Sequence, residues 1–307
     1  MRKLLVLLVA LVTVAAFAAV SISGSASVEL KVTYNASTTT LTPTLTSSGS
    51  VRLVLSGNVG EKTGFSVTFG PNPFSATNSS AYVWEYLYKT EALSVRYRLG
   101  ALSRGTSYVS KSGGAFALDF DIALGDLKDS LSVFVYPTGS ATTLVDLDVW
   151  NRLNFTFVTL TAFASGVLSA GAGSFPLLGL DATIDLAKAL NIQGATLSGY
   201  AYLGIDPSQT GFNMLTGYQF GVNFGIDQLS GGVWFKGPQT IGARVETTVL
   251  APVTIGGRVE LPVNLTNFSD VELEAFATWK SELLTHRISL DFKQQIATVA
   301  WKVSVSF

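Results

Sequence analysis

The stretch Trp301-Lys302-Val303-Ser304-Val305-Ser306-Phe307 closes the sequence and decides the fold. Every second residue in it is apolar, and the residues in between are polar. Successive side chains of a β-strand point to opposite sides, so this alternation predicts a strand with one apolar and one polar face. The rest of the chain indicates which solvent the apolar faces meet.

The composition combines high hydrophobicity with few charges. Of the 307 residues, 48% are hydrophobic and 13% are charged, whereas a soluble protein carries about 25% charged residues. After the N-terminal segment, no apolar run approaches the roughly 18 residues that identify a membrane helix. Only helices and closed barrels satisfy all backbone hydrogen bonds in lipid, so the composition predicts a transmembrane β-barrel.

Alternating segments recur along nearly the whole chain after Ser27. Many of them have about 8–11 residues, the length of a tilted membrane strand. About 19 segments are recognisable, and an even number follows if residues 28–34 and 39–46 form one interrupted strand. The sequence therefore predicts an all-β, antiparallel barrel of about 18 strands without a plug domain, or 16 if weak segments such as Val233–Phe235 are not strands. A soluble β-sandwich is the alternative, disfavoured by the uncharged loops.

The N-terminus has the pattern of a secretory signal peptide. Arg2 and Lys3 precede an apolar stretch, and small residues then offer cleavage after Ala18 or after Ala26. We expect a signal peptide over residues 1–26 and a barrel over residues 27–307, because a strand pattern starts at Val28. Removal of Arg2 and Lys3 from 20 basic against 21 acidic residues leaves a net charge of about −3, too weak to imply nucleic acid.

The connections between the expected strands alternate between short and long. Residues 90–91, 151–152 and 228–229 belong to the short set, and residues 47–50, 70–80, 100–114, 164–175 and 205–216 to the other set. Short periplasmic turns and longer outer loops are typical of transmembrane barrels. The alternation thus supports a barrel independently of composition.

The terminal strand resembles the C-terminal strand of bacterial outer-membrane β-barrels, which the barrel-assembly machinery reads. The resemblance rests on Trp301, Val303, Val305 and Phe307, although an aromatic residue often stands where Val305 does. It implies an outer-membrane location, contact with outer-membrane lipid, and the assembly machinery as a partner.

Charged residues gather on the polar faces of the expected strands, which a barrel of this size turns toward an aqueous lumen. Basic residues come first along the chain and carboxylates follow, so we expect a basic arc and an acidic arc. The predicted pore-lining residues are Arg52, Arg96, Arg98, Asp119, Asp121, Asp146, Asp148, Asp181, Asp185, Arg244, Glu246, Arg258, Glu260, Glu272 and Glu274. Simple solvation of a wet wall is the alternative.

Opposed arcs resemble the general porins, in which such charges create a transverse field and a long loop narrows the lumen. Two segments are candidates for that loop: residues 100–114, with Arg104 and Lys111, and the glycine-rich residues 164–175. The resemblance also implies a homotrimer.

Two finer expectations concern pairing and aromatic anchors. A turn centred on Pro252 pairs Arg244 with Glu260, and Glu246 with Arg258, joining opposite charges. Aromatic residues expected in the interfacial girdles are Tyr82, Trp84, Tyr86, Tyr88, Trp150 and Trp279.

These features predict an outer-membrane porin that passes ions and small hydrophilic solutes by passive diffusion, with mild cation preference from the net charge. A structural barrel of the outer envelope and a substrate-specific channel are the alternatives. We expect no enzyme activity, cofactor or metal: the single His286 has no catalytic neighbours, and no Cys/His cluster suits zinc.

Overall fold

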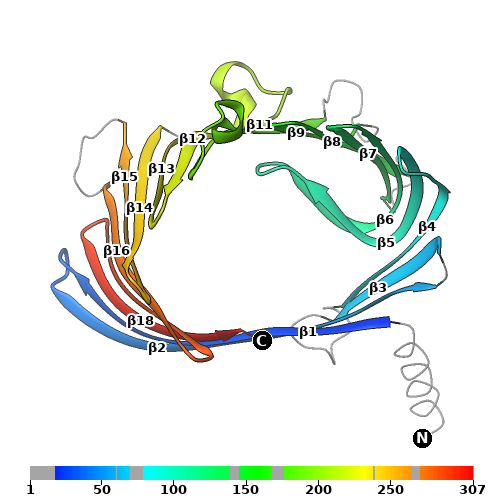
Figure 1. Ribbon diagram of the computed structural model, residues 1–307. Helices are drawn as coiled ribbons and strands as arrows, with labels where there is room; N and C mark the ends of the chain where they lie inside the picture. Colours follow the sequence, from blue (N-terminus) through cyan, green and yellow to red (C-terminus); the bar gives the residue numbers. More distant parts are fainter. Residues whose placement is uncertain are drawn as a thin grey trace, which may run out of the picture.

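The computed structural model describes residues 18–59, 61–69, 79–138, 145–167, 176–237, 239–263 and 270–306. Eighteen antiparallel strands form one sheet, each pairing with its neighbours in sequence, and β1 with β18. Figure 1 shows the resulting ring. The strands are β1 (Ala18–Asn35), β2 (Thr40–Val59), β3 (Thr63–Phe69), β4 (Ser79–Lys89), β5 (Leu93–Gly105), β6 (Ser110–Leu124), β7 (Leu127–Pro137), β8 (Val145–Phe155), β9 (Val158–Ser165), β10 (Leu177–Asp185), β11 (Ala195–Ile205), β12 (Leu215–Ile226), β13 (Leu229–Lys236), β14 (Thr240–Leu250), β15 (Val253–Pro262), β16 (Glu272–Ser281), β17 (Leu284–Lys293) and β18 (Ile296–Ser306). The predicted all-β barrel is confirmed.

The outer face of the barrel is apolar. Large side chains such as Leu41, Leu45 and Leu290 are exposed there, at 67%, 71% and 53% of their surface. Their strand neighbours on the inner face are polar, so the two faces suit lipid outside and water inside. Because β1 pairs with β18, the sheet closes on itself and leaves no unpaired edge strand, as a bilayer requires.

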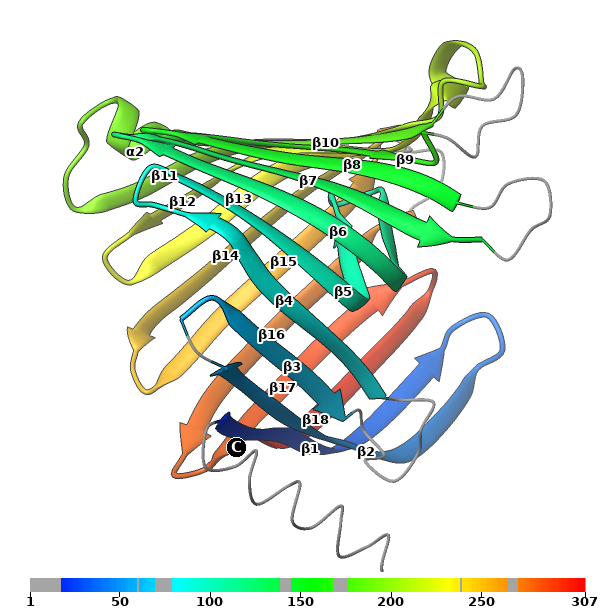
Figure 2. The same cartoon turned by 90° about the vertical axis from the view of Figure 1, so that its right-hand side faces the viewer.

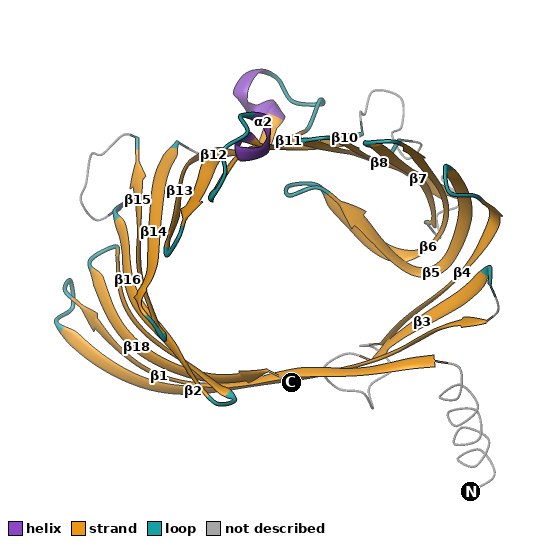
Figure 3. Cartoon of the chain, viewed as in Figure 1, coloured by secondary structure: helices purple, strands orange, loops and turns teal. Residues whose placement is uncertain are grey.

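Within the described residues, helical structure is confined to short pieces at the rims (Figure 3). Helix α2 (Leu186–Ala189) follows β10, and its N-cap Asp185 accepts a hydrogen bond from the Lys188 backbone N–H at 2.9 Å. The 3-10 helix η2 (Gly211–Met214) precedes β12. Figure 2 places α2 and the β11–β12 connection at opposite rims. No helix among the described residues is long and apolar enough to cross a bilayer.

Most of the long connections, such as those between β9 and β10, β11 and β12, and β15 and β16, lie at one rim, as predicted. Short turns share that rim as well, and the long β10–β11 connection (residues 186–194) lies at the opposite rim. The Ala36 backbone N–H donates to the Gln295 carbonyl at 3.1 Å, so the β1–β2 and β17–β18 turns share one rim. One predicted turn is wrong: residues 151–152 lie inside β8, and the turn comes at residues 156–157.

The predicted count of 18 strands is correct, but the merging of two segments that led to it is wrong. Residues 28–34 and 39–46 belong to two strands, β1 and β2, and the predicted loop at residues 47–50 lies within β2. Serine and glycine there indicate a turn, but Ser25 and Ser27 hydrogen-bond to Ser50 and Ser48 across the strands, at 3.1 and 2.8 Å. A wet inner face lets serines serve as strand residues.

The predicted register of the β14–β15 hairpin is wrong by two residues. Arg244 lies opposite Arg258, and Glu246 lies opposite Gly256. One residue of the error comes from the turn, because Leu250 pairs with Val253 across residues 251–252 and not across a three-residue turn. The other comes from an irregularity between Thr247 and Leu250, which gives β14 one extra residue. A shift of two keeps each side chain on its expected face but changes its partner.

The start of β1 bears on signal-peptide cleavage. Residues 18–24 pair with β2 alone, whereas residues 25–35 pair with both β2 and β18. Cleavage after Ala26 would remove the partner of residues 49–57 of β2, leaving unpaired backbone groups in the wall. We therefore expect the mature chain to begin at Ala19. Intact-mass spectrometry of the exported protein tests this; a chain beginning at Ser27 would contradict it.

Candidate functional site: the lumen and its inner hairpin

Cross-strand register places the predicted pore-lining residues on one face. Asp119 lies opposite Arg96 and Ser132, Asp148 opposite Phe134, and Arg258 opposite Glu274. Strand alternation and pairing place the other predicted pore-lining residues on this same inner face of the sheet. They are Arg52, Arg98, Asp121, Asp146, Asp181, Asp185, Arg244, Glu246, Glu260 and Glu272.

The predicted constriction loop at residues 100–114 is a regular β-hairpin that folds into the ring (Figure 1). Pairing between β4 and β5 ends at Gly100, and pairing between β6 and β7 begins at Phe116. Gly100 has φ +133°, and a side chain there would strike the Ala81 backbone. Glycine is needed at this bend. From it, the paired ends of β5 and β6 leave the wall together.

The underside of the hairpin forms a dry core against the wall. Leu102 and Ala115 of the hairpin pack with Ala117, Phe134 and Tyr136, all at most 5% exposed. A barrel of this width cannot fill its lumen with side chains of the wall. The hairpin forms a second layer that covers the apolar side chains on this part of the inner face. Apolar burial therefore holds the hairpin inside the ring.

The tip of the hairpin is attached to strands β10, β11 and β12, farther round the inner wall. The Ser107 backbone N–H and hydroxyl donate to the Asp181 carboxylate at 2.8 and 3.0 Å. Tyr108 packs against Gly204 through its Cβ and lays its ring over Gly217, so a side chain at either glycine would collide with it. Between bend and tip, the Trp150 indole N–H donates to the Gly105 carbonyl at 3.3 Å. The hairpin thus lies along the inner wall and is attached at several points.

The two residues predicted for a constriction both lie on this hairpin. The Arg104 guanidinium stands over the Trp150 ring, 5.1 Å from its centre, and the Lys111 ammonium stands 4.4 Å from the centre of Tyr136. Lys111 also pairs with Asp146 and, at 3.4 Å, with Asp148. The alternative loop at residues 164–175 lies largely outside the described residues.

The predicted basic and acidic arcs are not separated, because arginines and carboxylates bind one another directly. Asp119, which is 2% exposed, accepts from Arg98 at 2.6 and 2.7 Å and from Arg96 at 3.1 Å. The Ser132 hydroxyl donates to the same carboxylate at 2.7 Å. Adjacent strands bring these residues together, so their fields largely cancel instead of crossing the lumen.

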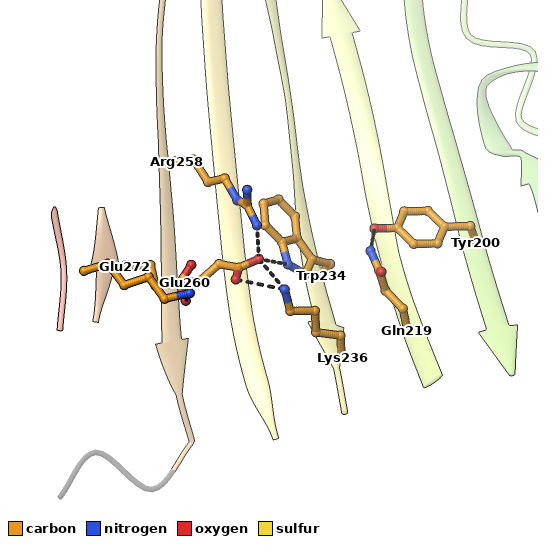
Figure 4. A network of polar contacts seen from close by, with 8 residues as sticks. Tyr200, Gln219, Trp234, Lys236, Arg258, Glu260 and Glu272 are labelled. Atoms are coloured by element: carbon orange, nitrogen blue, oxygen red, sulfur yellow. Dashed lines mark hydrogen bonds and ion pairs between the residues drawn. The ribbon is translucent and has the colours of Figure 1, made fainter. Parts of the chain in front are cut away.

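A second charged cluster lies on β13–β15, and it includes residues that the sequence analysis did not single out. Glu260 accepts from Lys236 at 2.8 Å, from the Trp234 indole N–H at 3.2 Å, and from Arg258 (Figure 4). Residues 233–235, a weak segment in the sequence, lie within the full strand β13 (Leu229–Lys236), which also carries Gly231 and Gly232. Those glycines form part of the lining of a recess of about 470 Å³ with Tyr200, Asn223, Trp234, Lys236, Arg244 and Arg258.

Most of the predicted aromatic girdle is wrong. Trp84, Tyr86 and Trp150 face the lumen: Trp84 packs edge-on against Tyr86, and Arg96 stands over Tyr86 at 5.6 Å. Tyr82 packs against the core beneath the hairpin. Tyr88, beyond a register shift, is 51% exposed and pairs with Val95. Packing against the hairpin and its core, invisible in a strand pattern, accounts for the inward positions of Tyr82 and Trp150.

Trp279 and His286 lie on the outer face near the short-turn rim. Their rings stack at 5.0 Å, and Trp301 stacks on the other side of His286 at 6.3 Å. Trp301, Val303 and Val305 share this outer face, and Phe307 lies outside the described residues. The histidine therefore belongs to an aromatic group facing lipid. Among the residues described, no group of three His, Cys, Asp or Glu could hold a metal ion.

The comparisons with known proteins concern the fold alone. No family model matches the sequence, and no curated protein is significantly similar to it. Solved structures are similar over almost the whole chain. The chain is similar to Pseudomonas aeruginosa OpdK with vanillate (TM-score 0.53, 9% identity, 94% of this chain and 98% of that chain). Similar values hold for P. aeruginosa OpdQ (0.55, 9%, 94% and 97%) and Acinetobacter baumannii OccAB3 (0.54, 8%, 94% and 99%).

The chain has the fold of a bacterial outer-membrane β-barrel channel. The likeness covers the full ring of strands, so the lumen described above is the lumen of this channel fold. At identities of about a tenth, it carries no residue-level correspondence. The site must be read from this chain's own side chains.

Proposed function

We propose that this protein is an outer-membrane diffusion channel that passes ions and small hydrophilic solutes without chemistry. The observation that carries the proposal is the position of the hairpin: it lies along β7–β12 and leaves the charged wall of β13–β18 facing the lumen. A charged wall that the hairpin leaves uncovered suits the passage of ions and hydrated solutes.

The inner hairpin supports sieving as the mechanism. It thickens one side of the wall with a second layer, and its tip is fastened by Ser107 and Asp181. Solutes then pass between that layer and the charged arc opposite. Width would select by size, and the charges would modulate passage.

A substrate-specific channel is the second candidate, and the recess on β11–β15 favours it. The recess combines polar groups with the Trp234 and Tyr200 rings on the inner face. Such a mixture suits a solute with both an apolar part and a hydrogen-bonding part. Saturable block of ion current by one class of solute would distinguish this candidate from a general channel.

Single-channel recording in a planar bilayer tests the proposal. We expect stepwise conductance that scales with bulk salt conductivity, because an open aqueous lumen adds no binding step for small ions. The proposed homotrimer predicts steps with three equal sublevels. A folded, inserted protein that gave no steps would overturn the diffusion channel and leave the structural barrel of the envelope.

A further inference from the structure

The barrel sorts the charges of this chain between the lumen and its outside. Six carboxylates lie in the turns at the rims: Glu61, Glu91, Asp126, Asp206, Asp227 and Glu282. Three more lie off the inner face, since Glu85 and Asp129 point outward and Asp270 precedes β16. Lys62 and Lys188 are the corresponding cations among the described residues.

Subtraction gives the charge of the inner face. The chain has 20 Lys and Arg and 21 Asp and Glu. Leaving out these outer residues, and Arg2 and Lys3 of the expected signal peptide, sixteen cations and twelve carboxylates remain on the inner face and the hairpin. The whole chain is slightly negative, but the lumen wall is positive.

The geometry of the ion pairs strengthens this sign. In each of nine inner-face ion pairs, the cation is more exposed than its carboxylate. The side chain of Arg258 is 40% exposed against 6% for Glu260, and that of Arg244 is 53% exposed against 21% for Glu246. Short carboxylates lie against the wall, whereas long cationic side chains reach into water. A passing solute therefore meets ammonium and guanidinium groups first.

The exposed cations converge at one place. Arg244 and Arg258 lie directly opposite each other on β14 and β15, an arrangement that destabilises a sheet in the absence of a counter-ion. Each is held by a glutamate on its own strand, and both line the recess with Lys236. Two facing guanidinium groups fit a small anion between them.

We infer that the lumen favours small anions over cations, with Arg244 and Arg258 as its main anion contact. The inference rests on the proposed diffusion channel. It reverses the preference expected from the net charge, because that charge includes the acidic rim. Rim charges in open water are screened within about 8 Å at physiological salt. Charges on the wall of the lumen lie close to a passing ion and beside a low-dielectric wall, so salt screens them less.

Reversal potentials in a KCl gradient test the inference. A mean lumen potential of about half of kT per unit charge would enrich anions over cations about threefold, so we expect chloride to permeate about three times more readily than potassium. Replacing both arginines, Arg244→Gln with Arg258→Gln, is expected to bring the ratio close to one. Lys62→Gln at the rim is the matched control and should leave it unchanged.

The outcomes separate the inference from the proposed function. Conductance with a cation-favouring reversal potential would overturn the inference and leave the diffusion channel intact. Absence of conductance would overturn the channel and the inference with it. If the double variant does not insert, the sign of the wild-type reversal potential and the permeability ratio of the single variant Arg244→Gln test the inference. The Arg244 side chain is 53% exposed and supports no core, so this variant should fold.

Discussion

Replacing residues 101–114 with an Asn-Gly turn is expected to raise the single-channel conductance at least about twofold. The hairpin and the wall pack as two sheets, which stand about 10 Å apart, so its removal frees about that width of the lumen. The measurement is open-channel current in symmetrical salt. The same variant should also admit larger neutral polymers in size-exclusion assays.

Two controls make the hairpin prediction specific. Shortening the β11–β12 connection, which lies outside the ring in Figure 1, should leave the conductance unchanged. A Ser107→Cys and Asp181→Cys pair should fix the tip by a disulfide in a chain that has no other cysteine, and conductance should stay at the wild-type value. Unchanged conductance after hairpin removal would show that the narrowest point lies elsewhere.

Asp119→Ala is expected to lower the free energy of unfolding by about 3 kcal/mol. The carboxylate is buried between Arg98, Arg96 and Ser132, and Arg98 is itself 7% exposed. Removing one partner of a buried pair leaves an uncompensated charge, which costs about 3–5 kcal/mol. Denaturant titration of the protein in lipid vesicles, followed by tryptophan fluorescence, measures the loss.

Asp121→Ala is the matched control for the buried pair. Asp121 lies two residues along the same strand and accepts one hydrogen bond from Ser94 at 3.3 Å, so its loss should cost less than about 1 kcal/mol. Combining Asp119→Ala with Arg98→Met should recover part of the stability, because the stranded charge disappears. Equal destabilisation by both single variants would contradict a special role for Asp119.

The sequence by itself determined the kind of solvent on each face and therefore the fold. Alternation from Val28 to Phe307, few charges and alternating connection lengths were sufficient, because a strand repeats every two residues whatever its neighbours are. For the same reason the inward side of Asp119, Asp148 and Arg258 followed from parity alone. Residues 100–114, with Arg104 and Lys111, were one of two candidates for a loop that folds into the lumen, through the resemblance to general porins.

The tertiary structure decided everything that depends on register. The two-residue turn at residues 251–252 and the irregularity between Thr247 and Leu250 together set Arg244 against Arg258 instead of Glu260, and no local pattern encodes such a shift. Gly100 turned the hairpin into the lumen, which buried Phe134 and drew Trp150 inward instead of to a girdle. Closure also separated rim carboxylates from lumen cations. Net charge is a sum over the chain, whereas a channel responds to the charges that its wall turns inward, and only the folded sheet assigns each charge to a side.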